Sequence, residues 1–121
     1  MEHCDLLLEI LKVESTRFVG MYNMNFEKIT DGYQSDIISH LSREEMQDSV
    51  RYDIRRWETY KMFQSQLGAA KYAMVKFENA ILLTFALNND EYLRVSIETD
   101  ADYKTIIEKI RAILIKENFA E

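Results

Sequence analysis

Three acidic residues alternate near the end of the chain, at Glu98, Asp100 and Asp102. Carboxylates spaced in this way are the ligands that calcium and magnesium prefer. The EF-hand pattern fails, however, because counting from Glu98 places Tyr103 at the glycine position and Lys109 at the closing acidic position. The alternative is that these acids cap the positive end of a following helix. We favour capping.

The first three residues, Met1-Glu2-His3, place a histidine third from an amine. The amine, two backbone amides and the imidazole together suit a square-planar copper or nickel ion. One residue makes the whole motif, so chance accounts for it as well.

Other motifs for catalysis or cofactor binding are absent from the sequence. It has no glycine-rich phosphate loop, no G-x-S-x-G, no H-E-x-x-H and no C-x-x-C. With one cysteine and two histidines, a tetrahedral zinc site would need several carboxylate ligands. The sequence therefore predicts no cofactor and no enzymatic activity.

Arginines and aromatic residues gather in one segment, 42–68. Arg51, Arg55 and Arg56 are spaced to recognise an acidic partner or a phosphate, or to form a solvated face with the nearby acids Asp48, Asp53 and Glu58. Aromatic and methionine enrichment is typical of interface cores, and here it comprises Trp57, Tyr60, Met62 and Phe63. Core packing within one chain explains Trp57 equally well. If Met62 and Phe63 are both exposed, an apolar patch is left for a partner.

The same segment is predicted to be one long helix. Ser42 and Glu45 fit a capping box, and Gly68 suits the left-handed position that ends many helices. The apolar stripe consists of Met46, Val50, Ile54, Trp57 and Tyr60, extended by Phe63 and Leu67. A helix of about 26 residues would be roughly 39 Å long, so we expect part of the stripe to extend beyond the sheet.

The remaining elements follow from periodicity. A short helix at 3–12 carries Cys4, Leu7, Leu8 and Leu11 on its apolar side. Strands are predicted at 17–22, 27–30, 71–77, 80–87 and 92–97, with Leu93, Val95 and Ile97 on one face of the last strand. Residues 33–41 are predicted to be a loop with a helical turn. A final helix begins near Asp100 or Asp102 and buries Ile106, Ile107, Ile110, Ile113 and Leu114. Short turns favour antiparallel pairing, so the class is α+β.

Composition limits the partners. The length of 121 residues suits a single domain over 1–121. The net charge of −6 argues against non-specific binding to nucleic acid and to anionic membranes. A single cysteine suits a reducing cytosol, and no apolar run approaches the roughly 20 residues that span a bilayer. We expect a cytoplasmic protein.

The order of elements resembles that of roadblock/LC7 domains, within the broader profilin-like group. The resemblance implies a five-stranded antiparallel sheet of order 2-1-5-4-3, with a long central helix on one face and terminal helices on the other. Such domains dimerise through the central helix and the adjacent edge strand, here 42–67 and 71–77. They serve as scaffolds or regulators of small GTPases, so the resemblance also implies a small GTPase as a possible partner.

Several short segments resemble a family of small proteins from ammonia-oxidising archaea that has no assigned activity. The segments are Arg56-Trp57-Glu58-Thr59, Tyr72-Ala73-Met74, Tyr92-Leu93-Arg94-Val95-Ser96 and Asp100-Ala101-Asp102, with an R-F-x-G start at Arg17-Phe18-Val19-Gly20. Members often have a glycine-rich second strand, where this chain offers only Gly32.

The leading hypothesis is a non-enzymatic homodimeric interaction or scaffold module. The expected interface residues are Arg55, Trp57, Tyr60, Met62, Phe63, Leu67, Tyr72 and Met74. An exposed edge strand invites pairing, although Lys71 and Lys76 are also suited to prevent it. The alternative is a profilin-like domain that senses a small ligand between sheet and helix. A fully packed core between Trp57 and the sheet residues Phe85 and Val95 would count against that alternative.

Overall fold

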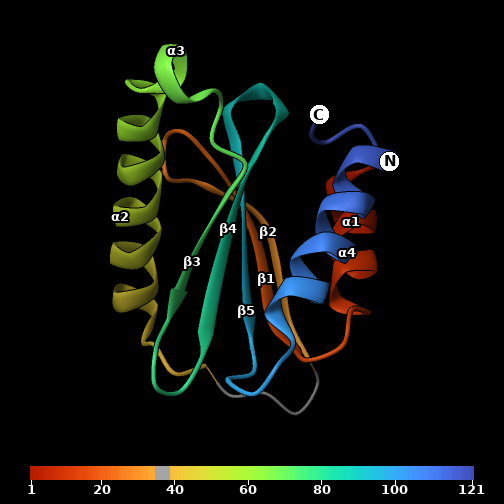
Figure 1. Cartoon of the computed structure of the whole chain (residues 1–121). Helices are drawn as coiled ribbons and strands as arrows, with labels where there is room; N and C mark the ends of the chain where they lie inside the picture. Colours follow the sequence, from red (N-terminus) through yellow and green to blue (C-terminus); the bar gives the residue numbers. More distant parts are fainter. Residues whose placement is uncertain (35–38) are drawn as a thin grey trace.

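The computed structural model describes residues 1–34 and 39–121, which form an α+β fold (Figure 1). The predicted loop over 33–41 therefore lies partly outside the described residues, at 35–38. The elements, in chain order, are α1 (His3–Leu11), β1 (Thr16–Asn23), β2 (Lys28–Tyr33), α2 (Arg43–Lys61), α3 (Gln64–Leu67), β3 (Tyr72–Lys76), β4 (Ile81–Leu87), the 3₁₀ turn η1 (Asn88–Asp90), β5 (Glu91–Ile97) and α4 (Tyr103–Lys116).

All five strands form one sheet in the order β2-β1-β5-β4-β3, and each neighbouring pair is antiparallel. Helix α2 covers one face of this sheet, and α1 and α4 cover the other (Figure 1). The strand order, the antiparallel pairing and the placement of the helices confirm the predicted architecture. The edge strands are β2, which pairs only with β1 among the described strands, and β3, which pairs only with β4.

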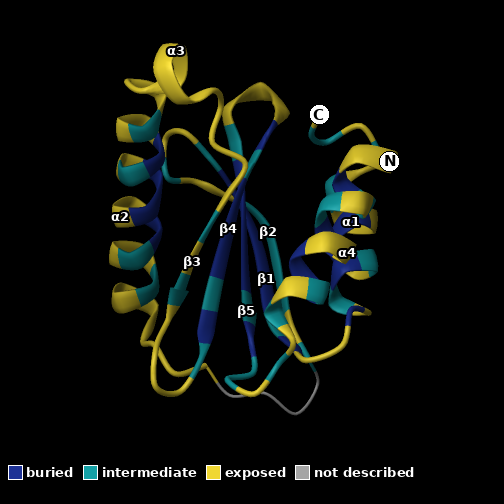
Figure 2. Ribbon diagram, in the orientation of Figure 1, coloured by how far each residue is buried: buried dark blue, intermediate teal, exposed yellow. Residues whose placement is uncertain are grey.

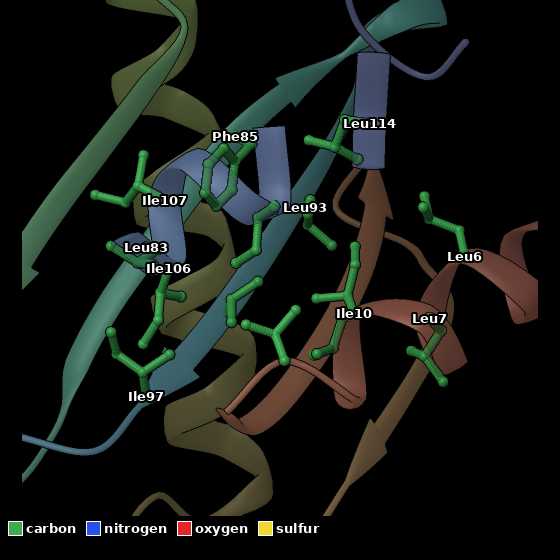
Figure 3. Packing of buried hydrophobic residues seen from close by; sticks show 14 of the residues in the cluster. Leu6, Leu7, Ile10, Leu83, Phe85, Leu93, Ile97, Ile106, Ile107 and Leu114 are labelled. Atoms are coloured by element: carbon green, nitrogen blue, oxygen red, sulfur yellow. The ribbon is translucent and has the colours of Figure 1, made fainter. Parts of the chain in front are cut away.

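The larger hydrophobic core lies between the sheet and the two terminal helices (Figure 3). Alternate strand residues point into it because successive side chains of a strand face opposite sides. On β5 these are Leu93, Val95 and Ile97, as predicted. Helix α4 contributes Ile106, Ile107, Ile110 and Leu114, also as predicted, whereas Ile113 is only partly buried.

The predicted apolar side of the first helix is correct for Leu7 and for the partly buried Leu11, and it is wrong for Cys4 and Leu8. The residues that α1 buries are Leu6, Leu7 and Ile10, while Leu8 is 56% exposed and Cys4 is also exposed. Apolar residues occupy most positions of this helix, so more than one stripe has helical spacing. The direction from which α4 and the sheet approach selects the buried stripe, and no local pattern encodes that direction.

The smaller core lies under α2 and consists of Tyr22, Val50, Ile54, Trp57 and Tyr92. Trp57 donates from Nε1 to Thr84 Oγ1 at 2.9 Å, so the indole nitrogen is satisfied inside the core. Phe85 and Val95 do not pack against Trp57, so the packing that would count against the small-ligand alternative does not occur between these residues. Those two residues belong to the larger core, because they alternate with Thr84 and Arg94 and point to the opposite face.

Helix α2 begins as predicted and ends earlier than predicted. Glu45 N donates to Ser42 Oγ at 3.1 Å and Ser42 N donates to Glu45 Oε1 at 2.9 Å, which confirms the capping box. The helix stops at Lys61, and Met62 N and Phe63 N bond to carbonyls only three residues back. Its side chains pack on the sheet only as far as Trp57 and Tyr60, so nothing favours continuing a straight helix.

The short helix α3 follows this break. Gly68 comes directly after it with a φ of +81°, a value that favours glycine. Within residues 1–34 and 39–121, no helix is both long and apolar enough to cross a membrane.

Candidate functional site

The break between α2 and α3 leaves three large apolar side chains in solvent. Met62 is 74% exposed, Phe63 is 49% exposed and Leu67 is 82% exposed. Figure 2 shows that α3 is exposed along its whole length and that β3 beside α2 is largely exposed. Because these side chains have no place in either core, burying them against a partner would be favourable. The sequence predicts an apolar patch for a partner if Met62 and Phe63 are both exposed, and both are exposed.

The edge strand β3 divides its side chains between the two faces of the sheet. Tyr72 and Met74 pair in register with Phe85 and Leu83, so they lie on the face covered by α4. They are 45% and 38% exposed, and Arg111 of α4 lies 5.9 Å from the Tyr72 ring. Ala73 and Val75 lie on the α2 face. The predicted interface residues therefore do not form one continuous patch on one face.

The other predicted interface residues belong to the body of α2. Trp57 is 3% exposed and fully part of the core, so it supports the helix and offers no surface to a partner. Tyr60 is half-buried and lies edge-on to Trp57, with ring centroids 5.4 Å apart. Arg55 is exposed and stacks over the Phe26 ring at 5.7 Å, on the side of the β1–β2 turn.

Tyr52, Arg56 and Tyr60 form a row along α2, and of these three only Tyr60 is among the expected interface residues. Tyr52 and Arg56 are one turn apart, and Tyr60 follows one turn later. Tyr52 is 66% exposed, and the Arg56 guanidinium lies 5.7 Å from its ring centroid. Arg56 Nε is buried without a hydrogen-bond partner in the described part of the chain. The four-residue spacing of Tyr52, Arg56 and Tyr60 is the sequence signal that could have identified this row.

Beneath the row, α2 is tied to the sheet by a buried ion pair. Arg94 Nε donates to Asp53 Oδ2 at 2.9 Å, and Arg56 Nη2 lies 3.4 Å from Asp53 Oδ1. Burial raises the pKa of the Asp53 carboxyl, and the charges of Arg94 and Arg56 oppose this effect. The sequence reasoning placed Asp53 among solvated charges. The signal it missed is that Asp53 is adjacent to Ile54 within the apolar stripe.

The acidic residues near α4 have structural roles. Asp102 caps α4, because its Oδ1 accepts from the backbone amide of Thr105 at 3.4 Å and its Oδ2 accepts from Thr105 Oγ1 at 2.7 Å. This confirms capping for Asp102. Glu98 instead pairs with Arg17 Nη1 at 3.1 Å. No group of three or more His, Cys, Asp or Glu residues suited to a metal ion occurs in the described ranges. His3 is the first residue of α1, and its Nε2 lies 2.8 Å from Glu91 Oε1.

Three solved structures with the same fold come from bacteria. A roadblock/LC7 domain from Streptomyces avermitilis superposes with a TM-score of 0.72 at 9% identity, covering 96% of this chain and 94% of that one. The gliding protein MglB from Thermus thermophilus gives 0.73 at 9% identity, covering 95% and 87%. MglB from Myxococcus xanthus gives 0.68 at 11% identity, covering 97% of each chain.

No family model matches the sequence, and neither does any curated protein. At 9–11% identity the structural likeness establishes the fold alone. The chain therefore has a roadblock/LC7-like fold.

Proposed function

We propose that this protein is a non-enzymatic homodimeric interaction module that associates through α2, α3 and the edge strand β3. The observation that carries the proposal is the exposure of Met62, Phe63 and Leu67, together with an edge of β3 that no other described strand pairs with. An isolated edge strand presents unpaired backbone donors and acceptors. Pairing β3 with β3 of a second copy across a two-fold axis would satisfy those groups and cover the apolar side chains together.

The row Tyr52, Arg56 and Tyr60 extends this surface along α2. Tyrosine and arginine are enriched among the residues that dominate binding energy. Trp57 takes a supporting role from within the core. Lys71 and Lys76 flank the strand and oppose pairing unless acidic groups of the partner copy lie near them.

A solved structure of this fold carries the description "MglB with tetrameric arrangement". It superposes with a TM-score of 0.68 at 11% identity, and its arrangement supports a proposal of assembly for this fold. A small GTPase as a further partner stays a prediction from the resemblance of element order.

Light scattering on a size-exclusion column tests the proposal. At tens of micromolar we expect a mass of twice the 14.4 kDa of the chain. Phe63→Asp places a charge in the proposed interface and should shift the mass to that of one chain. A wild-type monomer that Phe63→Asp leaves unchanged would overturn the proposal.

The matched control is Leu8→Asp. Leu8 is 56% exposed, similar to Phe63, but it lies on α1, away from α2 and β3. The Leu8→Asp variant should keep the mass of the dimer. If both variants dissociate equally, association does not depend on the α2–α3 surface.

A further inference from the structure

A cavity of about 470 Å³ lies between the amino-terminal half of α2 and the sheet. Its walls include Phe18 and Leu82 from the sheet, Met46 from α2, and Phe77 from the turn after β3. Pockets that hold small ligands have volumes of about 300–1,000 Å³ and mostly apolar walls with a few polar groups. A second cavity beside Trp57, farther along α2, has a volume of only about 100 Å³. The space large enough for a small ligand lies at the first turns of the helix.

One polar group lining this cavity is the buried guanidinium of Arg94, a residue only 2% exposed. Its Nε donates to Asp53, and its Nη2 donates to Ser49 Oγ at 2.5 Å. Its Nη1 instead lies 3.2 Å from Met46 Sδ. A thioether is a weak acceptor, so the hydrogen bond at Nη1 is weak. The Arg94 guanidinium also interacts with Tyr22, whose ring centroid lies 5.9 Å from Arg94 Cζ. A buried, charged donor with a weak hydrogen bond favours binding of an oxygen acceptor, above all a carboxylate.

The surrounding charges favour a single negative charge on the ligand. Two arginines, Arg17 and Arg94, line the cavity, and each is paired with a carboxylate, Glu98 and Asp53 respectively. At the rim, Glu45 accepts from the amide of Ser42 at the positive end of α2. His40 Nε2 lies 3.0 Å from Arg17 Nη2, and Glu78 is exposed. Because the carboxylates of Glu45 and Glu78 already add negative charge at the rim, a ligand with one negative charge is favoured over a dianion such as phosphate.

We infer that this cavity binds a small monocarboxylate with an apolar body. The carboxylate accepts from Arg94 Nη1, and the apolar body packs against Phe18, Leu82 and Met46. This ligand class goes beyond the proposed interaction function and does not depend on it, because one chain supplies every residue named.

The probe is octanoate, titrated calorimetrically into the whole protein, with octan-1-ol as the neutral comparison. We expect saturable binding of one octanoate per chain. Octan-1-ol should bind about tenfold more weakly or worse, because a hydroxyl forms a weaker hydrogen bond with a guanidinium than a carboxylate does. No saturable octanoate binding, or equal affinity for the alcohol, would overturn the inference.

Two variants at Met46 make the test specific. Met46→Glu places a carboxylate next to Arg94 Nη1 from within the chain, so it should abolish octanoate binding while raising the midpoint of thermal unfolding. Met46→Leu removes the sulfur and keeps the apolar shape, so octanoate should bind within about threefold of wild type. Unchanged affinity in folded Met46→Glu would contradict the assigned role of Arg94.

A third variant blocks the space directly. Ser96 lines the cavity, and Ser96→Phe should fill it and weaken octanoate binding about tenfold or more. Phe63→Asp, which dissociates the proposed dimer, should retain wild-type octanoate affinity because Phe63 does not line the cavity. Loss of binding in that variant would show that one chain is not sufficient. Failure of octanoate binding would therefore leave the proposed dimer untouched, and a monomeric protein would leave the proposed ligand site untouched.

Discussion

Arg94 of β5 and Asp53 of α2 form an ion pair that crosses from the sheet to its covering helix. Arg94 Nε and Asp53 Oδ2 are 2.9 Å apart, and the two side chains are 3% and 6% exposed. Removing two charges from water is costly, so the pair contributes to stability only while both partners and their hydrogen bonds are present. It also fixes where α2 lies along the sheet, and it orients the guanidinium that lines the cavity.

The first prediction concerns the loss of one member of this pair. Asp53→Ala should lower the free energy of unfolding by about 3–5 kcal/mol, because Arg94 is left buried and uncompensated. Urea denaturation measures the change. Asp48→Ala is the control, since Asp48 is exposed on the same helix and should change stability by no more than about 0.5 kcal/mol.

A double variant separates pairing from packing. Asp53→Leu combined with Arg94→Met removes both charges and should cost less than Asp53→Ala alone. If the double variant is less stable than Asp53→Ala, then losing the ion pair lowers the free energy of unfolding by more than burying the unpaired Arg94 charge does.

The second prediction concerns Gly20 in the centre of β1. A Cβ atom at this position would lie 2.8 Å from the Tyr22 ring and 2.9 Å from Phe18 Cζ. Gly20→Ala should therefore lower the free energy of unfolding by about 1–3 kcal/mol through overpacking. Thermal or urea unfolding measures it. Gly32→Ala provides the comparison, because its Cβ would meet Leu7 Cδ2 at 3.2 Å and Leu11 Cδ1 at 3.3 Å, and these flexible ends can move. A larger loss for Gly32→Ala would contradict this account.

The third prediction concerns alkaline pH. Burial raises the pKa of Tyr92 above its ordinary value of about 10, and the hydrogen bond from its hydroxyl to Glu58 Oε1 at 2.9 Å acts in the same direction. The folded state therefore holds the proton more tightly than the unfolded state. The associated stability is fully present below about pH 10 and is lost as pH rises through the raised pKa of the folded state.

Urea unfolding from pH 8 to 11 checks the alkaline effect. Tyr92→Phe cannot ionise at this position, so its stability should decline less steeply than that of wild type over the upper part of the range. Parallel decline of the two proteins would show that Tyr92 does not contribute. Comparing the slopes removes the effect of lysines that lose charge in both proteins.

The fourth prediction separates folding from association at α3. Leu67 is 82% exposed, so Leu67→Ser should change the free energy of unfolding of the single chain by no more than about 0.5 kcal/mol. If Leu67 lies in the dimer interface, the same change should raise the dissociation constant about tenfold or more. Sedimentation velocity over a range of concentrations measures the constant. An unchanged constant would place Leu67 outside the interface.

Local patterns in the sequence predicted much of this fold. The alternation of Leu93, Val95 and Ile97 assigned the inner face of β5 correctly, because side chains of a strand alternate whatever the strand packs against. Ser42 and Glu45 marked the start of α2 because the capping box involves only four neighbouring residues. The sequence reasoning also identified Met62 and Phe63 as the residues whose exposure would indicate an association surface.

Features that depend on distant segments were missed or assigned wrongly. The face that α1 buries depends on how α4 and the sheet approach it. The end of α2 at Lys61 depends on where its packing against the sheet ends. The register of β3 against β4 decides that Tyr72 and Met74 lie on the opposite face from α2.

The sequence by itself determined the elements, their order and the alternation of their faces, since periodicity and capping act within a few residues. Only the tertiary structure brought Asp53 to Arg94, 41 residues away, and left Arg94 Nη1 next to a sulfur at the wall of a cavity. Pairing between charges so far apart in sequence follows from how helix and sheet pack, and neither residue alone carries a local signal for it.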